Sequence, residues 1–341
     1  MQFFAKDNNI IGVAQDKSRA VVALQNQKAQ WPCASTYWIE NRVLYVSIPF
    51  TWELPIVKNQ IQQQSCFWDS VVVGGPATVL RIGFFDGMDF VKTGTRASGV
   101  LQRINPYATR TTEGCPRKCG FCGVKIIEPE WKELDEWPEL PILCDNNILA
   151  ASVGHFDRVC DRLEKWGWCD FNQGIDARLL TKYHAERFKR IGKPVLRLAF
   201  DSDNMKDEWM QAYEILRSVG IAKSRIRSYV LIGFNDNPDS AWRRCNFINA
   251  LGIKPLPMWH HKLDQLQPNI VREDQIKLGW TNAERKHIMR FFYYHIIDAE
   301  SKHRLCASCA TPEDSATQNT AESAKNSIQQ RQPEMAKGLS S

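Results

Sequence analysis

Three cysteines lie within eight consecutive positions of the sequence. The stretch GCPRKCGFCG (114–123) places Cys115, Cys119 and Cys122 in the spacing CxxxCxxC. Thiolates are soft ligands that bind zinc, copper(I) and iron–sulfur clusters. Because no fourth cysteine lies beside them, the stretch supplies one ligand fewer than a four-coordinate structural zinc site needs. Three clustered thiolates suit a [4Fe-4S] cluster in which one iron is left for an outside ligand.

Two alternatives remain for these cysteines. In the first, Cys119 and Cys122 form a zinc site with Cys306 and Cys309 of the later CASC stretch, and Cys115 is a spare buried thiol. In the second, the three thiols are unrelated core residues. The usual ferredoxin spacings, CxxCxxCxxxC and CxxxxCxxC, do not match the stretch.

The composition is that of an ordinary soluble globular protein. The chain has 341 residues, of which 43% are hydrophobic and 24% charged, and a net charge of +6 that is compatible with a polyanionic partner. No apolar run approaches the ~18 residues that span a bilayer, so we expect no membrane partner. The N-terminal MQFFAKDNN lacks the apolar core of a secretory signal, and we expect a cytoplasmic protein. In that reducing compartment, 11 cysteines favour metal binding or buried thiols over disulfides.

The first part of the chain predicts a small Rossmann-like α/β domain over residues 1–100. A strand run covers 38–50, and an amphipathic helix covers 54–66. A buried parallel strand follows in 70–80 and breaks at Gly74-Gly75-Pro76. Strand, helix and strand in this order are typical of a βαβ unit.

Residues 101–265 predict an alternation of strands and helices. The expected strands are 140–145, 168–174, 194–202, 226–234 and 253–259, and the expected helices between them are 147–167, 181–192, 207–220 and 238–252. This pattern indicates a parallel sheet curled toward a barrel, with fewer than the eight units of a closed one. Four other cysteines fall in these patterns and are expected to be core thiols: Cys144, Cys160, Cys169 and Cys245.

The remaining residues predict a helical C-terminal extension over 266–310 and a disordered tail over 311–341. The extension includes an amphipathic helix in 282–300. The tail is rich in Ser, Thr, Gln, Asn, Ala and Glu and has few large apolar residues.

The cysteine stretch resembles the cluster motif of the radical SAM superfamily, which is CxxxCxxC with an aromatic residue, here Phe121, before the last cysteine. The resemblance implies a partial (β/α)6-type TIM barrel, a [4Fe-4S] cluster on the three thiolates, and S-adenosyl-L-methionine (SAM) on the open iron. It also implies reductive cleavage of SAM, hydrogen abstraction from a substrate, and a one-electron donor of the flavodoxin or ferredoxin type. Such cofactors supply the difficult chemistry while the protein positions them.

The resemblance extends to the polar residues at the ends of the predicted strands. CDNN (144–147) resembles the acidic turn of cobalamin-class members, and VLIGFNDNPDS (230–240) resembles the motif whose backbone contacts adenine. The candidate SAM contacts are Asp145, Asn146, Gln173, Asp201, Ser202, Ile232 and Gly233, and Phe121 is expected to cover the cluster. The alternative for each polar residue is a helix N-cap, since Asp, Asn and Ser are preferred there.

The stretch VVVGGPA (71–77) is similar to the GGP turn of the cobalamin-binding domain that often precedes such barrels. However, the DxHxxG motif that ligates cobalt is absent, and no histidine precedes His155. We therefore expect a degenerate domain without cobalamin.

Two further features concern metals and substrate. Cys306 and Cys309 are candidates for an auxiliary metal site, with His295 and His303 as added ligands and a free CxxC as the alternative. An aromatic and basic mixture near the C-terminal end could stack bases and neutralise phosphates, or could simply pack on the barrel; it comprises Trp259, Lys262, Arg285, Arg290, Tyr293 and Tyr294. The substrate expected from it is an RNA base or nucleotide, and the competing function is a non-catalytic, zinc-stabilised, nucleic-acid-associated protein.

Overall fold

The structure is a computed structural model that describes residues 34–94, 97 and 99–294. The predicted tail 311–341, the pair Cys306 and Cys309, and His295 and His303 lie outside the described residues. The chain divides into a unit up to Arg285, which holds every described sheet, and a unit from Lys286 onward.

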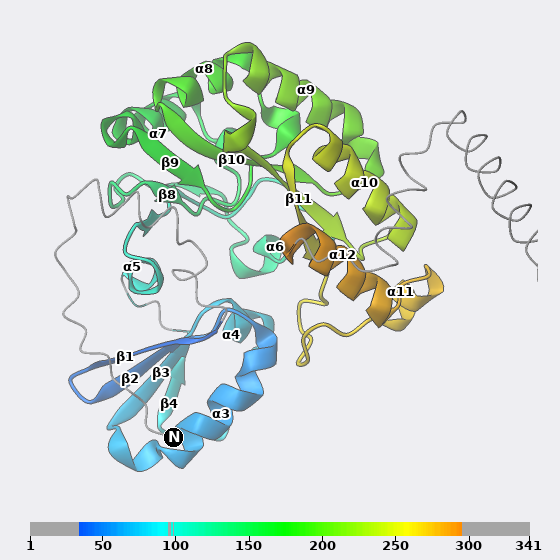
Figure 1. The fold of residues 1–341 in the computed structure, drawn as a ribbon. Helices are drawn as coiled ribbons and strands as arrows, with labels where there is room; N and C mark the ends of the chain where they lie inside the picture. Colours follow the sequence, from blue (N-terminus) through cyan, green and yellow to red (C-terminus); the bar gives the residue numbers. More distant parts are fainter. Residues whose placement is uncertain (1–33, 95–96, 98, 295–341) are drawn as a thin grey trace, which may run out of the picture. The chain divides into compact units, whose positions relative to one another are not determined.

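The first sheet has four strands in the order β1-β2-β3-β4 (Figure 1). They are β1 (Thr36–Glu40), β2 (Val43–Ser47), β3 (Ser70–Gly74) and β4 (Val91–Thr93). β1 pairs with β2 antiparallel, whereas β2, β3 and β4 are parallel. The single strand run predicted for 38–50 is therefore wrong, because the chain reverses at Asn41 and Arg42, whose φ angles are 48° and 62°.

Helix α3 (Leu54–Gln63) links β2 to β3 and completes the predicted βαβ unit. It buries Leu54, Val57 and Ile61 against the sheet. After β3 the chain turns at Gly75, whose φ is 97° and whose Cα lies so close to Ile48 that an added Cβ would meet its carbonyl oxygen at 2.5 Å. Helix α4 (Pro76–Leu80) begins directly after this turn.

The second sheet has six strands in the order β12-β11-β10-β9-β8-β5, and all neighbours are parallel. The strands are β5 (Ala108–Thr109), β8 (Ile142–Leu143), β9 (Trp168–Phe171), β10 (Lys193–Phe200), β11 (Ile226–Ile232) and β12 (Lys254–Trp259). The predicted α/β class with a parallel sheet is confirmed. Within the described residues, no strand pairing joins β5 to β12, so the sheet is not closed.

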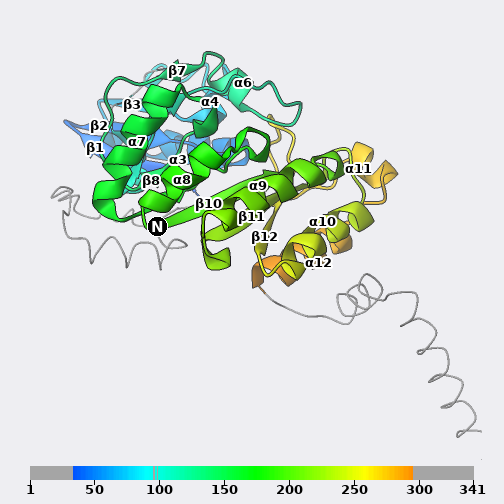
Figure 2. The same cartoon turned by 90° about the horizontal axis from the view of Figure 1, so that it is seen from above.

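Four helices alternate with these strands: α7 (Val153–Trp166), α8 (Lys182–Arg190), α9 (Lys206–Ser218) and α10 (Pro238–Ala250). Helices α9 and α10 lie alongside β10, β11 and β12 (Figure 2). Even-numbered residues of β11 face these helices, as shown by Ser228, whose hydroxyl accepts a hydrogen bond from Trp209 Nε1 at 3.1 Å. Odd-numbered residues of β11 therefore face the opposite side of the sheet.

Helix α7 is shorter than the helix predicted for 147–167. A 3₁₀ turn, η3 (Ile148–Ala150), comes first, and α7 begins after Ser152, whose hydroxyl accepts from the backbone of His155. Its end is as predicted, because Gly167 takes the left-handed conformation with φ 70°.

The other helices and strands follow, and all but the last helix, of 13 residues, are short. They are α5 (Val100–Ile104), β6 (Thr112–Glu113), α6 (Val124–Ile127), β7 (Lys132–Glu133), α11 (Glu273–Lys277) and α12 (Asn282–Tyr294), and the 3₁₀ helices η1 (Thr51–Glu53), η2 (Ser65–Phe67), η4 (Ala177–Leu179), η5 (Asp203–Met205) and η6 (Lys223–Arg225). Among the described residues, no helix is long and apolar enough to cross a bilayer. The four predicted core thiols, at positions 144, 160, 169 and 245, are buried.

Candidate functional site

The cysteine loop follows β5 and β6, the first strand of the parallel sheet and the short strand after it. Gly114 opens the loop with a φ of 72°, and a Cβ there would lie 2.1 Å from the carbonyl oxygen of Glu130. Only glycine fits this turn, because an L side chain would meet backbone and a strained φ together. The glycine before the first cysteine is therefore a steric requirement of the loop.

A partly buried ion pair holds the start of the loop. The Arg110 guanidinium donates to both oxygens of Glu128 at 2.6 Å. Glu128 Oε2 also accepts from the Gly114 amide at 3.0 Å and from Asn146 Nδ2 at 2.9 Å. Burial raises the pKa of Glu128, but these hydrogen bonds more than offset it and hold that pKa below its usual value. Glu128 thus ties the loop to the end of β8 as a carboxylate.

The three predicted ligands lie on this loop with partly exposed thiols. Burial raises the pKa of Cys122, and the nearby thiols of Cys119 and Cys115 raise it further by charge repulsion. Asn147 Nδ2 lies 3.7 Å from Cys115 Sγ, which is hydrogen-bond distance for sulfur. Within the described part of the chain, no group of three or more His, Cys, Asp or Glu side chains is arranged to hold a metal ion.

The donor set nevertheless fits a cationic cluster. Three thiolates close enough to oppose one another's ionisation are stabilised when metal ions neutralise them. The charges of Cys119 and Cys115 raise the pKa of Cys122 in this way, whereas the other described cysteines are either buried in the core or, like Cys66, exposed outside the loop.

Aromatic rings lie beside the loop. Phe121 contacts Phe234 edge to face, with 5.4 Å between ring centroids, and Phe234 contacts His260 at 4.8 Å. A Cβ on Gly120 would touch the Phe234 ring at 3.4 Å. Phe121 therefore packs against the segment that follows β11, on the side of the loop where the ends of β11 and β12 lie.

Asp145 lies directly after β8 and is buried. Its Oδ1 accepts from the backbone amides of Thr111 and Thr112 at 2.6 Å and from the Thr112 hydroxyl at 2.9 Å. Its Oδ2 has no hydrogen-bond partner among the described residues. Burial raises the pKa of Asp145, and these hydrogen bonds offset that rise in part. One oxygen fixes the strand end, and the other is buried without a partner among the described residues.

The ends of β9 and β10 also reach the loop. Arg117, between the first two cysteines, pairs with Asp176 at 2.6 Å, and Asp176 binds Arg178 at 2.7 Å. Burial raises the pKa of Asp201 to about 6, against the favourable charge of Arg178. The charge of Asp201 in turn raises the pKa of Cys122. The charge of Asp201 therefore acts on the cysteine loop.

The remaining predicted contacts differ in position. Gln173 is exposed, and its side chain hydrogen-bonds the Cys144 thiol. Asn146 is engaged by Glu128, as described above. Ser202 is exposed and precedes η5 without capping it through its side chain.

At the end of β11, Ile232 points its buried side chain toward the helices, and its carbonyl accepts from the His260 amide at 2.8 Å. Gly233 has a φ of 80°, and a Cβ would lie 2.5 Å from the Trp259 ring. Its amide donates to Asp236 Oδ1 at 2.8 Å, and its carbonyl accepts from the buried Gln275 side chain at 2.7 Å. Trp259 is itself buried against this turn, so it is a core residue and does not stack an incoming base.

The alternative interpretation of the polar residues at strand ends, that they are helix N-caps, holds for some of them only. Asp176 caps η4 and Asn237 caps α10 through their side chains. Asp145 does not cap α7, because Ser152 does. Some residues that support the site carry no local sequence motif and were not predicted. They form ion pairs or hydrogen bonds with residues far away along the chain, and they include Arg110, Glu128, Arg117 and Gln275.

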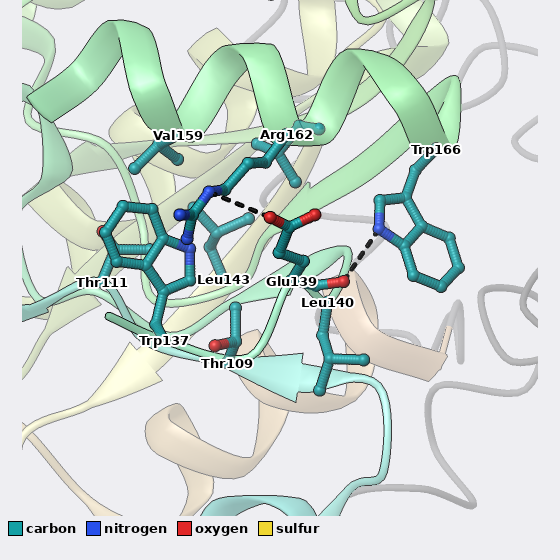
Figure 3. Close-up of a pocket in the computed structure, with 10 residues that line it drawn as sticks. Thr109, Thr111, Trp137, Glu139, Leu140, Leu143, Val159, Arg162 and Trp166 are labelled. Atoms are coloured by element: carbon teal, nitrogen blue, oxygen red, sulfur yellow. Dashed lines mark hydrogen bonds and ion pairs between the residues drawn. The ribbon is translucent and has the colours of Figure 1, made fainter. Parts of the chain in front are cut away.

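A small cavity of about 10 Å³ lies away from the loop, between β8 and α7 (Figure 3). The Arg162 side chain covers this cavity. Its guanidinium carbon lies 4.1 Å from the Trp137 ring centroid, and its Nε pairs with Glu139 Oε1 at 3.2 Å. The volume is that of a single water probe. We therefore assign this cavity to packing of the helix on the sheet.

His260 and His261, which directly follow β12, predict that the protein loses stability in acid. Burial lowers the pKa of His261 to about 4, and the charges of Arg285 and His260 lower it further. Because the unfolded chain takes up this proton at pH 6.5 and the folded chain does not, the free energy of unfolding falls as the pH drops from 6.5 toward 4. His261→Gln is expected to reduce that slope by at most about 1.4 kcal/mol per pH unit, less where solvent screens the ring.

Urea unfolding of both proteins at several pH values measures the two slopes. Curves for the original protein and His261→Gln that stay parallel from pH 6.5 to about 4 would show that this ring does not titrate as described.

No protein-family model matches the chain, and no curated protein matches it at a significant level.

Proposed function

We propose that the protein is a radical SAM enzyme in which Cys115, Cys119 and Cys122 hold a [4Fe-4S] cluster. The observation that carries this proposal is the CxxxCxxC loop at the start of a parallel sheet, with its three thiols close enough to raise the pKa of Cys122. The bound cofactors would supply a one-electron cleavage of SAM that ends in hydrogen abstraction from the substrate. The electron donor we propose is of the flavodoxin or ferredoxin type.

The strand ends would hold SAM beside the loop. Ligands of parallel α/β sheets gather at the carboxyl ends of the strands. Asp145 Oδ2 and the half-buried Asp201 carboxyl offer acceptors for an amino or hydroxyl group. The turn at Ile232 and Gly233 would lie beside adenine as a packing surface, because the Gly233 amide and carbonyl already bind Asp236 and Gln275 and the Ile232 carbonyl accepts from the His260 amide. Asn146, Gln173 and Ser202 stand beside these groups as further candidate contacts.

The architecture supports the same proposal. Six parallel strands in chain order, each of the last five followed or preceded by a helix, support our proposal of a partial (β/α)6-type TIM barrel. We place the boundaries at 1–100 for the Rossmann-like domain, 101–265 for the barrel and 266–310 for the helical extension. A cytoplasmic location and a nucleic-acid base or nucleotide as substrate belong to the proposal.

Anaerobic reconstitution of the purified protein with iron and sulfide tests the proposal. We expect a brown protein that, once reduced, converts SAM to methionine and 5′-deoxyadenosine. Metal analysis is made on the same sample. Stoichiometric zinc without SAM cleavage would favour the zinc-stabilised, non-catalytic protein instead.

A further inference from the structure

A cavity of about 450 Å³ lies outside the cysteine loop, between the end of α4 and the segment that follows β12. Arg81 lines it from the first domain, and Lys262, Gln265, Ile270 and Arg272 line it from the segment. Its volume is in the range of sites that bind small molecules. We call it the basic cavity.

The lining of the basic cavity carries more positive than negative charge. Three of its residues are cationic, and Asp264 is the acidic residue among those that line it. Asp264 lies 3.5 Å from Lys262 on the exposed rim. Arg272 is fixed by Asp274 at 2.8 Å and by the carbonyl oxygen of His260 at 3.2 Å. Because Asp274 compensates Arg272 and Asp264 compensates Lys262, Arg81 is the lining cation without an ion pair among the described residues, and it favours an anionic ligand.

Two buried polar atoms of the basic cavity are unsatisfied. Within the described structure, neither Arg81 Nε nor Gln265 Oε1 has a hydrogen-bond partner. A buried polar atom without a partner costs free energy, and such atoms often mark an absent ligand. One atom donates and the other accepts, so the ligand needs an anionic acceptor and also a donor such as an amino or hydroxyl group.

The segment after β12 that lines the basic cavity contacts both the first domain and the cysteine loop. The Thr51 hydroxyl donates to the carbonyl oxygens of Leu263 and Gln265, and Leu266 packs on the core of the first domain. Leu263 also lies against the cysteine loop, where a Cβ on Gly123 would be 3.2 Å from its side chain. Helix α4 contacts α6, which follows the last cysteine. The cavity is therefore held next to the cysteine loop by fixed contacts.

We propose that the basic cavity binds the phosphate of a nucleotide. The Arg81 guanidinium matches phosphate oxygens in charge and geometry, while Arg272, whose Nε and Nη2 both bind Asp274, forms part of the polar wall. Gln265 Oε1 would accept from the sugar or base, and Ile270 would contact its apolar face. The same chemistry is offered by a free mononucleotide and by one phosphodiester of an RNA strand. Binding at this site needs neither the cluster nor SAM, so it stands apart from the radical chemistry.

Isothermal titration of the full chain with uridine 5′-monophosphate, and separately with a short single-stranded oligouridylate, tests the proposal. Arg81→Gln is expected to weaken binding about tenfold or more, because it removes a charge-assisted hydrogen bond. Arg42→Gln is the matched control, since Arg42 lies in the same domain, exposed and paired with Asp69 outside the cavity. Lys262→Gln on the opposite wall is a second test and is expected to weaken binding several-fold.

Each outcome has a defined meaning. Mononucleotide binding that Arg81→Gln loses and Arg42→Gln keeps supports a free nucleotide as ligand. Oligouridylate binding with the same pattern, without mononucleotide binding, supports an RNA phosphodiester. No binding of either probe, or equal effects of the cavity variants and Arg42→Gln, would overturn the proposal whatever the result of the SAM cleavage assay.

Discussion

Cys119→Ala is expected to abolish reductive cleavage of SAM. Cys119 is the middle thiol of the loop, its carbonyl accepts from the Cys122 amide at 3.2 Å, and its charge raises the pKa of Cys122. Two remaining thiols cannot hold three irons, so iron bound after reconstitution should fall together with 5′-deoxyadenosine formation. We expect the rate to drop by at least about two orders of magnitude, as when a cofactor ligand is lost.

Cys66→Ala is the matched control for this variant. Cys66 is an exposed free thiol outside the loop, so its removal should leave iron content and SAM cleavage unchanged. Iron and SAM cleavage that persist in Cys119→Ala would contradict the ligand assignment. A loss of both in Cys66→Ala would point to a different ligand set.

Asp170→Asn is expected to lower the free energy of unfolding by about 3–5 kcal/mol. Asp170 on β9 forms an ion pair with Arg197 on β10, and both side chains are buried. Arg197 Nη1 also reaches the carbonyl oxygen of Phe171 at 3.4 Å, and its guanidinium lies 5.9 Å from the Tyr229 ring centroid. These weaker contacts do not neutralise its charge. The variant would therefore leave a positive charge buried within the sheet.

Asp69→Asn is the control, because its partner Arg42 forms a similar pair in which both side chains are more than half exposed. Exposed pairs contribute less than about 1 kcal/mol, so this variant should unfold almost as the original protein does. Urea denaturation measures both. The double variant Asp170→Leu with Arg197→Met should recover most of the loss, since it removes both charges together. Equal losses in Asp170→Asn and Asp69→Asn would refute a buried ion pair.

Local patterns predicted much of the fold. The spacing of Leu54, Val57 and Ile61 predicts α3, because residues three and four apart share a helix face. Gly167 predicts the end of α7, because only a residue without Cβ takes its left-handed conformation freely. The hairpin between β1 and β2 was missed, because Asn41 and Arg42 lack the Asn-Gly or Asp-Gly signal of such turns.

The residues of the candidate site likewise fall into those that local patterns predict and those that they do not. The three thiols and their spacing can be read from the chain alone, since eight consecutive residues carry the whole motif. The sequence also placed Asp145, Asp201 and Gly233 at strand ends, because each follows a run of apolar residues. Which oxygen of Asp145 is occupied, and which residues support the loop, depended on residues far away along the chain.

Those supporting contacts depend on how distant parts of the chain pack together. Glu128 reaches Arg110 across 18 positions, and Gln275 reaches Gly233 across 42. Hydrogen bonds of this kind have no period or spacing in sequence, because they form wherever two elements meet and a buried polar group needs a partner. The motif is local and can be read from the chain, whereas the side chains that hold it in place are chosen by packing.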